Sequence, residues 1–137
     1  MKFVCLTEKF YAHYKDCPEI LEKAARPYAD LEVEIDGYIF AIPFRHHIKH
    51  KHAFHTLGEA GLDYSKAVPI TEPDYIEDYT GEIDTRELKA IKGRDVLITN
   101  GMRKYYRLFL KAKQYPTNPH YNNIRRCSAL QYFFYLL

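Results

Sequence analysis

Residues 31–45 have the sequence LEVEIDGYIFAIPFR, and this stretch decides the fold. Apolar side chains alternate with acidic ones in its first half, which predicts a half-buried strand over residues 28–35. The Asp36-Gly37 dipeptide favours the tight turn of a β-hairpin. The nearly continuous apolar run at residues 38–42 predicts the partner strand, placed centrally in a sheet. An antiparallel hairpin is therefore expected in the first half of the chain.

The sequence before the hairpin predicts a strand followed by two short helices. Residues 1–6 alternate loosely between apolar and other side chains, as a strand does. Thr7 is expected to cap a helix that extends to Tyr14. Pro18 suits the first position of a second helix over residues 18–25.

The sequence after the hairpin predicts two further strands and an acidic loop. The strands are expected at residues 51–56 and 63–70, with Gly58 and Gly61 in the loop between them. Residues 71–82 are rich in carboxylates and predict a loop exposed to solvent. The first half of the chain thus predicts about five short antiparallel strands.

Helices dominate the expected second half. A helix capped by Asp84 or Thr85 is expected first, followed by a long basic amphipathic helix over residues 94–113. The Asn100-Gly101 pair could split this long helix in two.

The end of the chain predicts a loop and a last helix. Prolines and asparagines place the loop at residues 115–123, and Ser128 is expected to cap an apolar helix over residues 129–137. Together these elements predict an α+β domain, with an antiparallel sheet first and a helix-rich second half.

Length and composition limit the class of protein. The chain has 137 residues, the size of one domain, and 47% of them are hydrophobic, so a packed core is expected. No apolar run approaches the roughly 20 residues that cross a bilayer, and the N-terminus becomes charged too early for a secretory signal. Three unevenly spaced cysteines indicate reduced thiols in a cytoplasmic protein.

Charge is unevenly distributed, although the net charge is only +2. Residues 59–87 hold nine acidic side chains against two basic ones, and residues 88–137 hold ten Lys or Arg against one Asp. Such asymmetry indicates a charged partner rather than a particular fold. A basic final third could follow a phosphate backbone.

The second strand of the hairpin is expected to end in a turn at Pro43-Phe44, and a basic segment (residues 45–55) lies beyond it. This basic segment contains five of the seven histidines, with one arginine and two lysines. No carboxylate occurs between Asp36 and Glu59. The composition is that of a site for an anion.

Three interpretations of the basic segment compete. His50 is spaced from His46 and His52 as metal ligands can be, but neighbouring cations would repel a metal ion and no cysteine or carboxylate joins them. The segment could instead be a solvated loop without chemistry. It could also act on RNA, because cleavage without a metal needs a base, an acid and cations that stabilise the charged phosphorus intermediate.

The order MKF…LTEKFY, then LEVEIDGYIFAIPFRHHIKHKHAF, then GLDYSKAVPI resembles the toxins of type III toxin–antitoxin systems. It is most similar to the TenpN branch and more distantly to ToxN and AbiQ. The resemblance covers about residues 1–70, and the basic second half, with NGMRKYYRLFLKA and SALQYF, fits the same branch.

The resemblance implies a single toxin domain over residues 1–137 with a Kid/CcdB-like fold, a bent half-barrel of antiparallel strands with helices packed on it. It implies a metal-independent endoribonuclease without a cofactor, whose 2′-OH attack leaves a 2′,3′-cyclic phosphate and a 5′-hydroxyl. The implied partners are a repeat pseudoknot RNA antitoxin, which the toxin processes and with which it forms a closed ring, and cellular or phage RNA. Growth inhibition and phage defence in the cytoplasm, away from membranes, would follow.

The resemblance also implies catalytic residues. Arg45 falls on a family threonine and His46 on a family serine, and Lys49 lies one residue beyond a family lysine. Tyr11 is adjacent to the position of a family tyrosine in the first helix. Because the hydroxyls are replaced, His46 is expected to transfer a proton or to hold phosphate.

Further RNA contacts are expected from basic and aromatic side chains near this site and on the long helix. They are His47, His50, Lys51, His52, Tyr28, Arg103, Lys104 and Arg107. A non-catalytic RNA-binding module remains the alternative, since the family's hydroxyl positions are lost.

Overall fold

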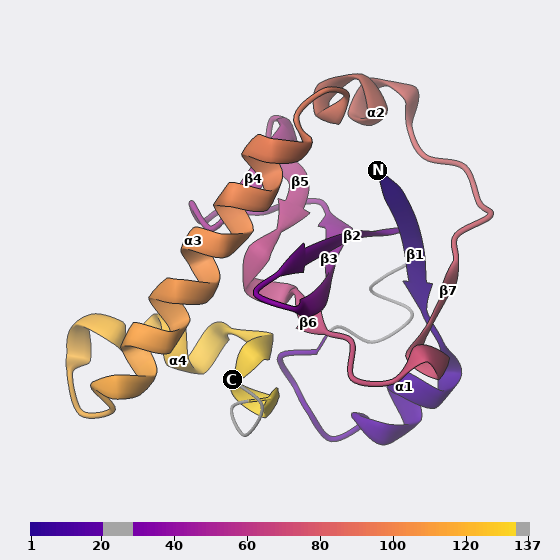
Figure 1. The fold of residues 1–137 in the computed structure, drawn as a ribbon. Helices are drawn as coiled ribbons and strands as arrows, with labels where there is room; N and C mark the ends of the chain where they lie inside the picture. Colours follow the sequence, from indigo (N-terminus) through magenta and orange to yellow (C-terminus); the bar gives the residue numbers. More distant parts are fainter. Residues whose placement is uncertain (21–28, 134–137) are drawn as a thin grey trace.

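The computed structural model describes residues 1–20 and 29–133, and it has an α+β fold (Figure 1). Seven antiparallel strands form the sheet, in the order β4-β5-β3-β2-β1-β7 with β6 also paired to β3. The strands are β1 (Lys2–Leu6), β2 (Asp30–Ile35), β3 (Tyr38–Arg45), β4 (Ala53–Leu57), β5 (Ala60–Asp63), β6 (Val68–Pro69) and β7 (Ile76–Asp78).

Most of the helical structure follows the sheet in the sequence, as predicted. The α-helices are α1 (Glu8–His13), α2 (Thr85–Ile91), α3 (Asp95–Gln114) and α4 (Asn122–Cys127). Short 3-10 turns are η2 (Tyr64–Lys66), η3 (Pro73–Tyr75), η4 (Pro119–Tyr121) and η5 (Ala129–Phe133). No helix among the described residues is both long and apolar enough to cross a membrane.

The predicted hairpin is confirmed. β2 and β3 pair in antiparallel register from Asp30 opposite Pro43 to Ile35 opposite Tyr38. Asp36 and Gly37 have φ values of +52° and +84°, the left-handed conformation that a two-residue hairpin turn requires.

The turn predicted at Pro43-Phe44 is wrong, because β3 continues through both residues. On one side β3 pairs with β2, and the Phe44 N–H donates to the Ala29 carbonyl (3.3 Å). Backbone N–H and carbonyl groups point alternately to the two sides of a strand, so the Pro43 nitrogen points away from β2. On that side β3 pairs with β6 as far as Ala41 and with β5 only from Phe44 onwards. The missing N–H of proline therefore removes no ladder hydrogen bond.

Two predictions after the hairpin are also wrong. Gly61 lies inside β5, where the carbonyl oxygen of Phe54 leaves no room for a Cβ atom. The strand predicted over residues 63–70 is interrupted by η2, because the Asp63 carboxylate accepts the Ser65 N–H (2.9 Å) and caps the turn.

The acidic stretch at residues 71–82 is not only a loop. It contains η3 and the edge strand β7, which pairs with β1 from Leu6 opposite Ile76 to Val4 opposite Asp78. An edge strand lets carboxylates remain in solvent while the backbone pairs, so charge alone did not exclude a strand here.

The helix caps agree with the sequence. The Thr7 hydroxyl accepts the Phe10 N–H (3.4 Å) at the start of α1, and the Asp84 carboxylate accepts the Arg86 N–H (2.8 Å) at the start of α2. The helix predicted at residues 18–25 lies largely outside the described residues.

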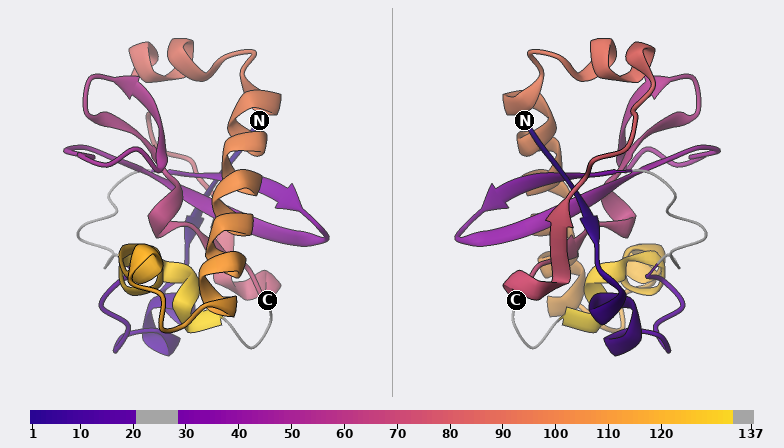
Figure 2. Two further views of the ribbon diagram at one scale, coloured as in Figure 1. Left: turned by 90° about the vertical axis from the view of Figure 1, so that its left-hand side faces the viewer. Right: turned by 90° about the vertical axis from the view of Figure 1, so that its right-hand side faces the viewer.

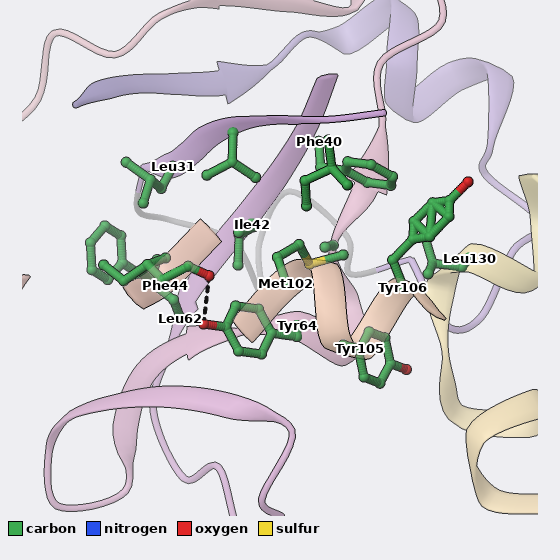
Figure 3. Packing of buried hydrophobic residues seen from close by; sticks show 14 of the residues in the cluster. Leu31, Phe40, Ile42, Phe44, Leu62, Tyr64, Met102, Tyr105, Tyr106 and Leu130 are labelled. Carbon is green, nitrogen blue, oxygen red and sulfur yellow. Dashed lines mark hydrogen bonds between the residues drawn. The ribbon is translucent and has the colours of Figure 1, made fainter. Parts of the chain in front are cut away.

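The predicted break at Asn100-Gly101 is wrong, since α3 is one helix of 20 residues. A Cβ atom at Gly101 would collide with the Tyr64 ring, whose hydroxyl donates to the Ile98 carbonyl (2.9 Å; Figure 3). The glycine is therefore a packing site for Tyr64 rather than a helix breaker.

The helix α3 lies across one face of the sheet and buries the main core (Figures 1 and 2). Met102 and Tyr106 face the β3 side chains Phe40 and Ile42 (Figure 3), with the Phe40 and Tyr106 ring centroids 5.5 Å apart. A second cluster lies beneath α1, where Phe10 packs against nearby aromatic rings.

The end of the chain departs from prediction. The predicted loop at residues 115–123 contains η4 and the first two residues of α4. In place of a final helix over residues 129–137 the described residues form η5, in which the Ser128 hydroxyl accepts the Leu130 N–H (3.2 Å). Residues 134–137 lie outside the described part of the chain.

Candidate functional site

A buried carboxylate, Asp63, holds the basic segment against the sheet. It is 0% exposed and accepts hydrogen bonds from the Arg45 guanidinium (2.7 Å), the Ser65 hydroxyl (2.6 Å) and the Ser65 N–H (2.9 Å). The His50 Nε2 atom lies 3.3 Å from the same carboxylate. A buried negative charge is stable only with such partners, so Arg45 and His50 are structural anchors here.

Both ring nitrogens of His50 have partners. Its Nδ1 atom accepts the His52 N–H (3.0 Å), which requires a lone pair on Nδ1 and places the ring proton on Nε2. That proton faces Asp63 and the Ser65 hydroxyl, which is 3.3 Å away. His50 therefore orients the backbone of His52.

His52 has a different environment, although it lies only two residues further along. Its half-buried ring packs against Tyr105, with 5.3 Å between the ring centroids. Burial is the main cause that lowers the pKa of His52 below its usual value, the neighbouring His50 and Lys51 lower it further, and the Asp63 carboxylate opposes them in part. Among the described residues neither ring nitrogen of His52 is engaged in a hydrogen bond, so an unprotonated imidazole is available near neutral pH.

His52 lies in a groove of about 450 Å³ between β4 and α3, here called the β4–α3 groove. Lys51 and Lys104 line the two sides of the groove, and Phe54, Leu97 and Tyr105 line it as well. Lys51 and Lys104 are exposed, and neither forms an ion pair within the described part of the chain. The fold thus brings the basic segment and the basic helix together around one histidine.

The basic surface continues along α3 beyond the groove. Arg107 and Lys111 follow Lys104 on the exposed side of the helix, and no ion pair neutralises them in residues 1–20 or 29–133. Arg103 is less open, since its guanidinium donates to the Asn100 side chain. Of the three helix residues predicted to contact RNA, Lys104 lines the groove directly.

His46 lies in a separate pocket of about 150 Å³ lined by Phe44, Ile83, Asp84 and Glu87. Glu87 is buried and accepts the Thr56 hydroxyl (3.2 Å). The Arg86 side chain holds the pKa of Asp84 below its usual value, so Asp84 stays negative. A phosphate placed at His46 would face these carboxylates.

Between these two histidines, His47 and Lys49 face solvent on either side of a buried residue, Ile48. The Ile48 side chain is buried, and its N–H donates to the Glu59 carbonyl (2.8 Å), which anchors the middle of the segment. His47 adopts φ of +59° on one side of this anchor, and Lys49 is exposed on the other. Neither lines the β4–α3 groove.

The predicted tyrosines are not in this site. Tyr11 lies on α1, packs edge-on against Phe10 (5.7 Å between ring centroids), and belongs to the second cluster. Figures 1 and 2 place α1 at the other end of the molecule from β4 and β5. Tyr28 lies outside the described residues.

Sequence reasoning missed Asp63, Ser65 and Tyr105 as parts of the site. The Asp-x-Ser spacing from Asp63 to Ser65 is typical of a side-chain-capped turn and could have indicated the anchor. Tyr105 could be recognised only as an apolar position of a helix.

No group of three or more His, Cys, Asp or Glu side chains in the described residues is arranged to hold a metal ion. Comparisons of this chain with protein-family models, with curated proteins and with solved structures find no match. Function is therefore inferred from the site and from the sequence resemblance.

Proposed function

We propose that this protein is a metal-independent endoribonuclease toxin of a type III toxin–antitoxin system, and that RNA is cleaved in the β4–α3 groove. The observation that supports it best is the half-buried His52 ring, whose pKa is lowered mainly by burial, in a groove that Lys51 and Lys104 also line. A base beside two cations is what attack by a 2′-hydroxyl on the neighbouring phosphate requires.

In the proposed reaction His52 takes the proton of the 2′-hydroxyl, and the 2′-oxygen attacks phosphorus. The ammonium groups of Lys51 and Lys104 stabilise the negative charge that develops on the phosphate oxygens. The bond from phosphorus to the 5′-oxygen breaks, and that oxygen leaves with a proton from one of the ammonium groups. The products are a 2′,3′-cyclic phosphate and a 5′-hydroxyl.

The proposal moves the proton-transfer role from His46 to His52. His46 lies beside Asp84 and Glu87, which disfavour a phosphate, whereas His52 lies between cations. Arg45 acts through Asp63 as an anchor in this proposal, and Lys49 would contact RNA outside the groove.

The resemblance supplies the rest of the proposal. The open antiparallel sheet with α3 packed across it is compatible with a Kid/CcdB-like half-barrel. The partners would be a repeat pseudoknot RNA antitoxin, which the toxin processes and with which it forms a ring, and cellular or phage RNA. The protein would act in the cytoplasm, in growth inhibition and phage defence.

The test is cleavage of RNA by the purified protein in EDTA, followed by analysis of the product ends. We expect 2′,3′-cyclic phosphate ends, and no cleavage of the same RNA carrying a 2′-deoxynucleotide at the scissile position. Co-expression of the repeat RNA should relieve growth inhibition. A protein that neither cleaves RNA nor slows growth would contradict the proposal.

A second candidate function is a non-catalytic RNA-binding module. The anchoring of Arg45 and His50 on Asp63 favours it, because two groups suited to catalysis serve the fold instead. RNA binding that weakens steeply with salt, without any cyclic phosphate product, would identify this function.

A further inference from the structure

The β4–α3 groove has an apolar wall that phosphate contacts do not explain. Leu97 is 54% exposed, and it lines the groove with Phe54 and Leu108. A site that only followed a phosphate backbone would need cations and no such wall.

The two tyrosines that line the groove, Tyr64 and Tyr105, are buried in the core. The Tyr64 hydroxyl donates to the Ile98 carbonyl (2.9 Å), and the Tyr105 ring packs against the ring of His52. Burial raises the pKa of Tyr64 to about 12, so this hydroxyl stays protonated. The apolar surface that a ligand can reach is therefore that of Leu97 together with the partly buried Phe54.

The backbone of β4 adds hydrogen-bonding groups beside this wall. β4 is the last strand in the described sheet order, so its outer edge has no neighbouring strand there. The His52 carbonyl accepts the Tyr64 N–H (3.0 Å) and so points towards β5. Because backbone polar groups of successive strand residues point to opposite sides, the N–H and carbonyl of Ala53 point away from β5. Ala53 also lines the groove.

We propose that the β4–α3 groove holds one unpaired nucleotide of RNA, with its base against Phe54 and Leu97 and its phosphate between Lys51 and Lys104. The Ala53 backbone meets the edge of the base. This inference rests on the proposed function, because it takes RNA as the ligand, and it adds that the RNA must be single-stranded at this point.

The requirement for an unpaired base follows from the chemistry of the wall. In a duplex, stacking covers the faces of each base and pairing covers its Watson–Crick edge. A base must leave the stack before it can lie against Phe54 or meet Ala53. A groove that bound only phosphates would accept duplex and single-stranded RNA alike.

The test measures binding in EDTA with 2′-fluoro RNA, which has no 2′-hydroxyl and is not cleaved. We expect a single strand to bind at least about tenfold more tightly than a duplex of the same length, because stacking on aromatic side chains adds affinity. Equal affinity for the two forms would overturn the inference.

A pair of neighbouring variants locates the base. Leu97→Ala should weaken single-strand binding about fivefold through lost apolar contact, whereas Val96→Ala should change it less than about twofold, because Val96 is 74% exposed and does not line the groove. Leu97→Glu and Val96→Glu each add one negative charge, so a difference in RNA affinity between these two variants reflects the position of the residue and not its charge. Equal effects within both pairs would overturn the inference.

The outcomes separate this inference from the proposed cleavage. A single-strand preference that depends on Leu97, in a protein that leaves ordinary RNA intact, would support the nucleotide site and contradict the proposed enzyme. Cleavage that is unaffected by Leu97→Ala in KM and in kcat would support the enzyme and contradict the nucleotide site.

Discussion

The two ends of the basic segment lie in opposite electrostatic environments. At its start, His46 shares a pocket with Asp84 and Glu87. Six residues later, His52 lies in a groove with Lys51 and Lys104. Similar side chains, close in sequence, therefore differ in what they can bind, because α2 supplies carboxylates to one end and α3 supplies a lysine to the other.

The largest expected effect separates the two histidines. His52→Ala should lower the rate of RNA cleavage at least about 100-fold, as expected for a lost general base. His46→Ala should leave the rate within about threefold. Single-turnover kinetics measure both, with circular dichroism to check that each variant folds. A larger loss for His46→Ala would return the proton-transfer role to the position that the resemblance indicated.

The next effect tests the anchor of the groove. Asp63→Ala leaves Arg45 and His50 without their buried partner and should lower the free energy of unfolding by about 3 kcal/mol. Asp78→Ala, an exposed carboxylate on β7, should change it by less than about 0.5 kcal/mol. Urea denaturation measures both, and equal effects would show that Asp63 is not an anchor.

A third effect concerns the cations of the groove. The double variant Lys51→Ala/Lys104→Ala removes the two proposed phosphate contacts and should reduce the slope of log K against log salt by about 1.4 for single-stranded RNA. Lys89→Ala on α2 removes an exposed charge that does not line the groove and should leave the slope nearly unchanged. A slope that responds equally to Lys89 would indicate general attraction rather than a site.

The smallest effect is a shift in pH dependence. The pKa of His52 is lowered from its usual 6.5, so this imidazole, the proposed base, stays unprotonated until the pH falls below that value. Cleavage should therefore decrease on acidification with a midpoint below 6.5. Because unfolded His52 binds a proton at higher pH than folded His52, the free energy of unfolding should also fall over the same acid range. A midpoint above 6.5 would exclude His52 as the base.

Much of the fold could be predicted because it depends on local chemistry. The β2–β3 hairpin follows from alternation and from Asp36-Gly37, and the caps at Thr7 and Asp84 follow from side chains that accept nearby N–H groups. Predictions failed where a distant residue changes the meaning of a local signal. Gly101 does not break α3, because Tyr64 fills the space above it.

For the candidate site, the sequence indicated residue types but not how the fold arranges them. Lys51, His52 and Lys104 were expected to contact RNA, and the fold brings these three together. Three further residues were expected to act with them and lie elsewhere. Arg45 pairs with the buried Asp63 carboxylate, and His46 lies in the pocket with Asp84 and Glu87. Tyr11 is on α1, at the other end of the molecule. The missing information was which helix covers which side of the basic segment.

The amino-acid sequence alone specifies the hairpin, most helices and a cluster of histidines and cations, since each depends on side chains a few residues apart. Packing decides which histidine is buried enough to stay unprotonated, and which charges it faces. These properties depend on solvent exclusion and on residues far apart in sequence, such as Tyr105, which packs against His52, and Lys104, which lines the same groove as Lys51.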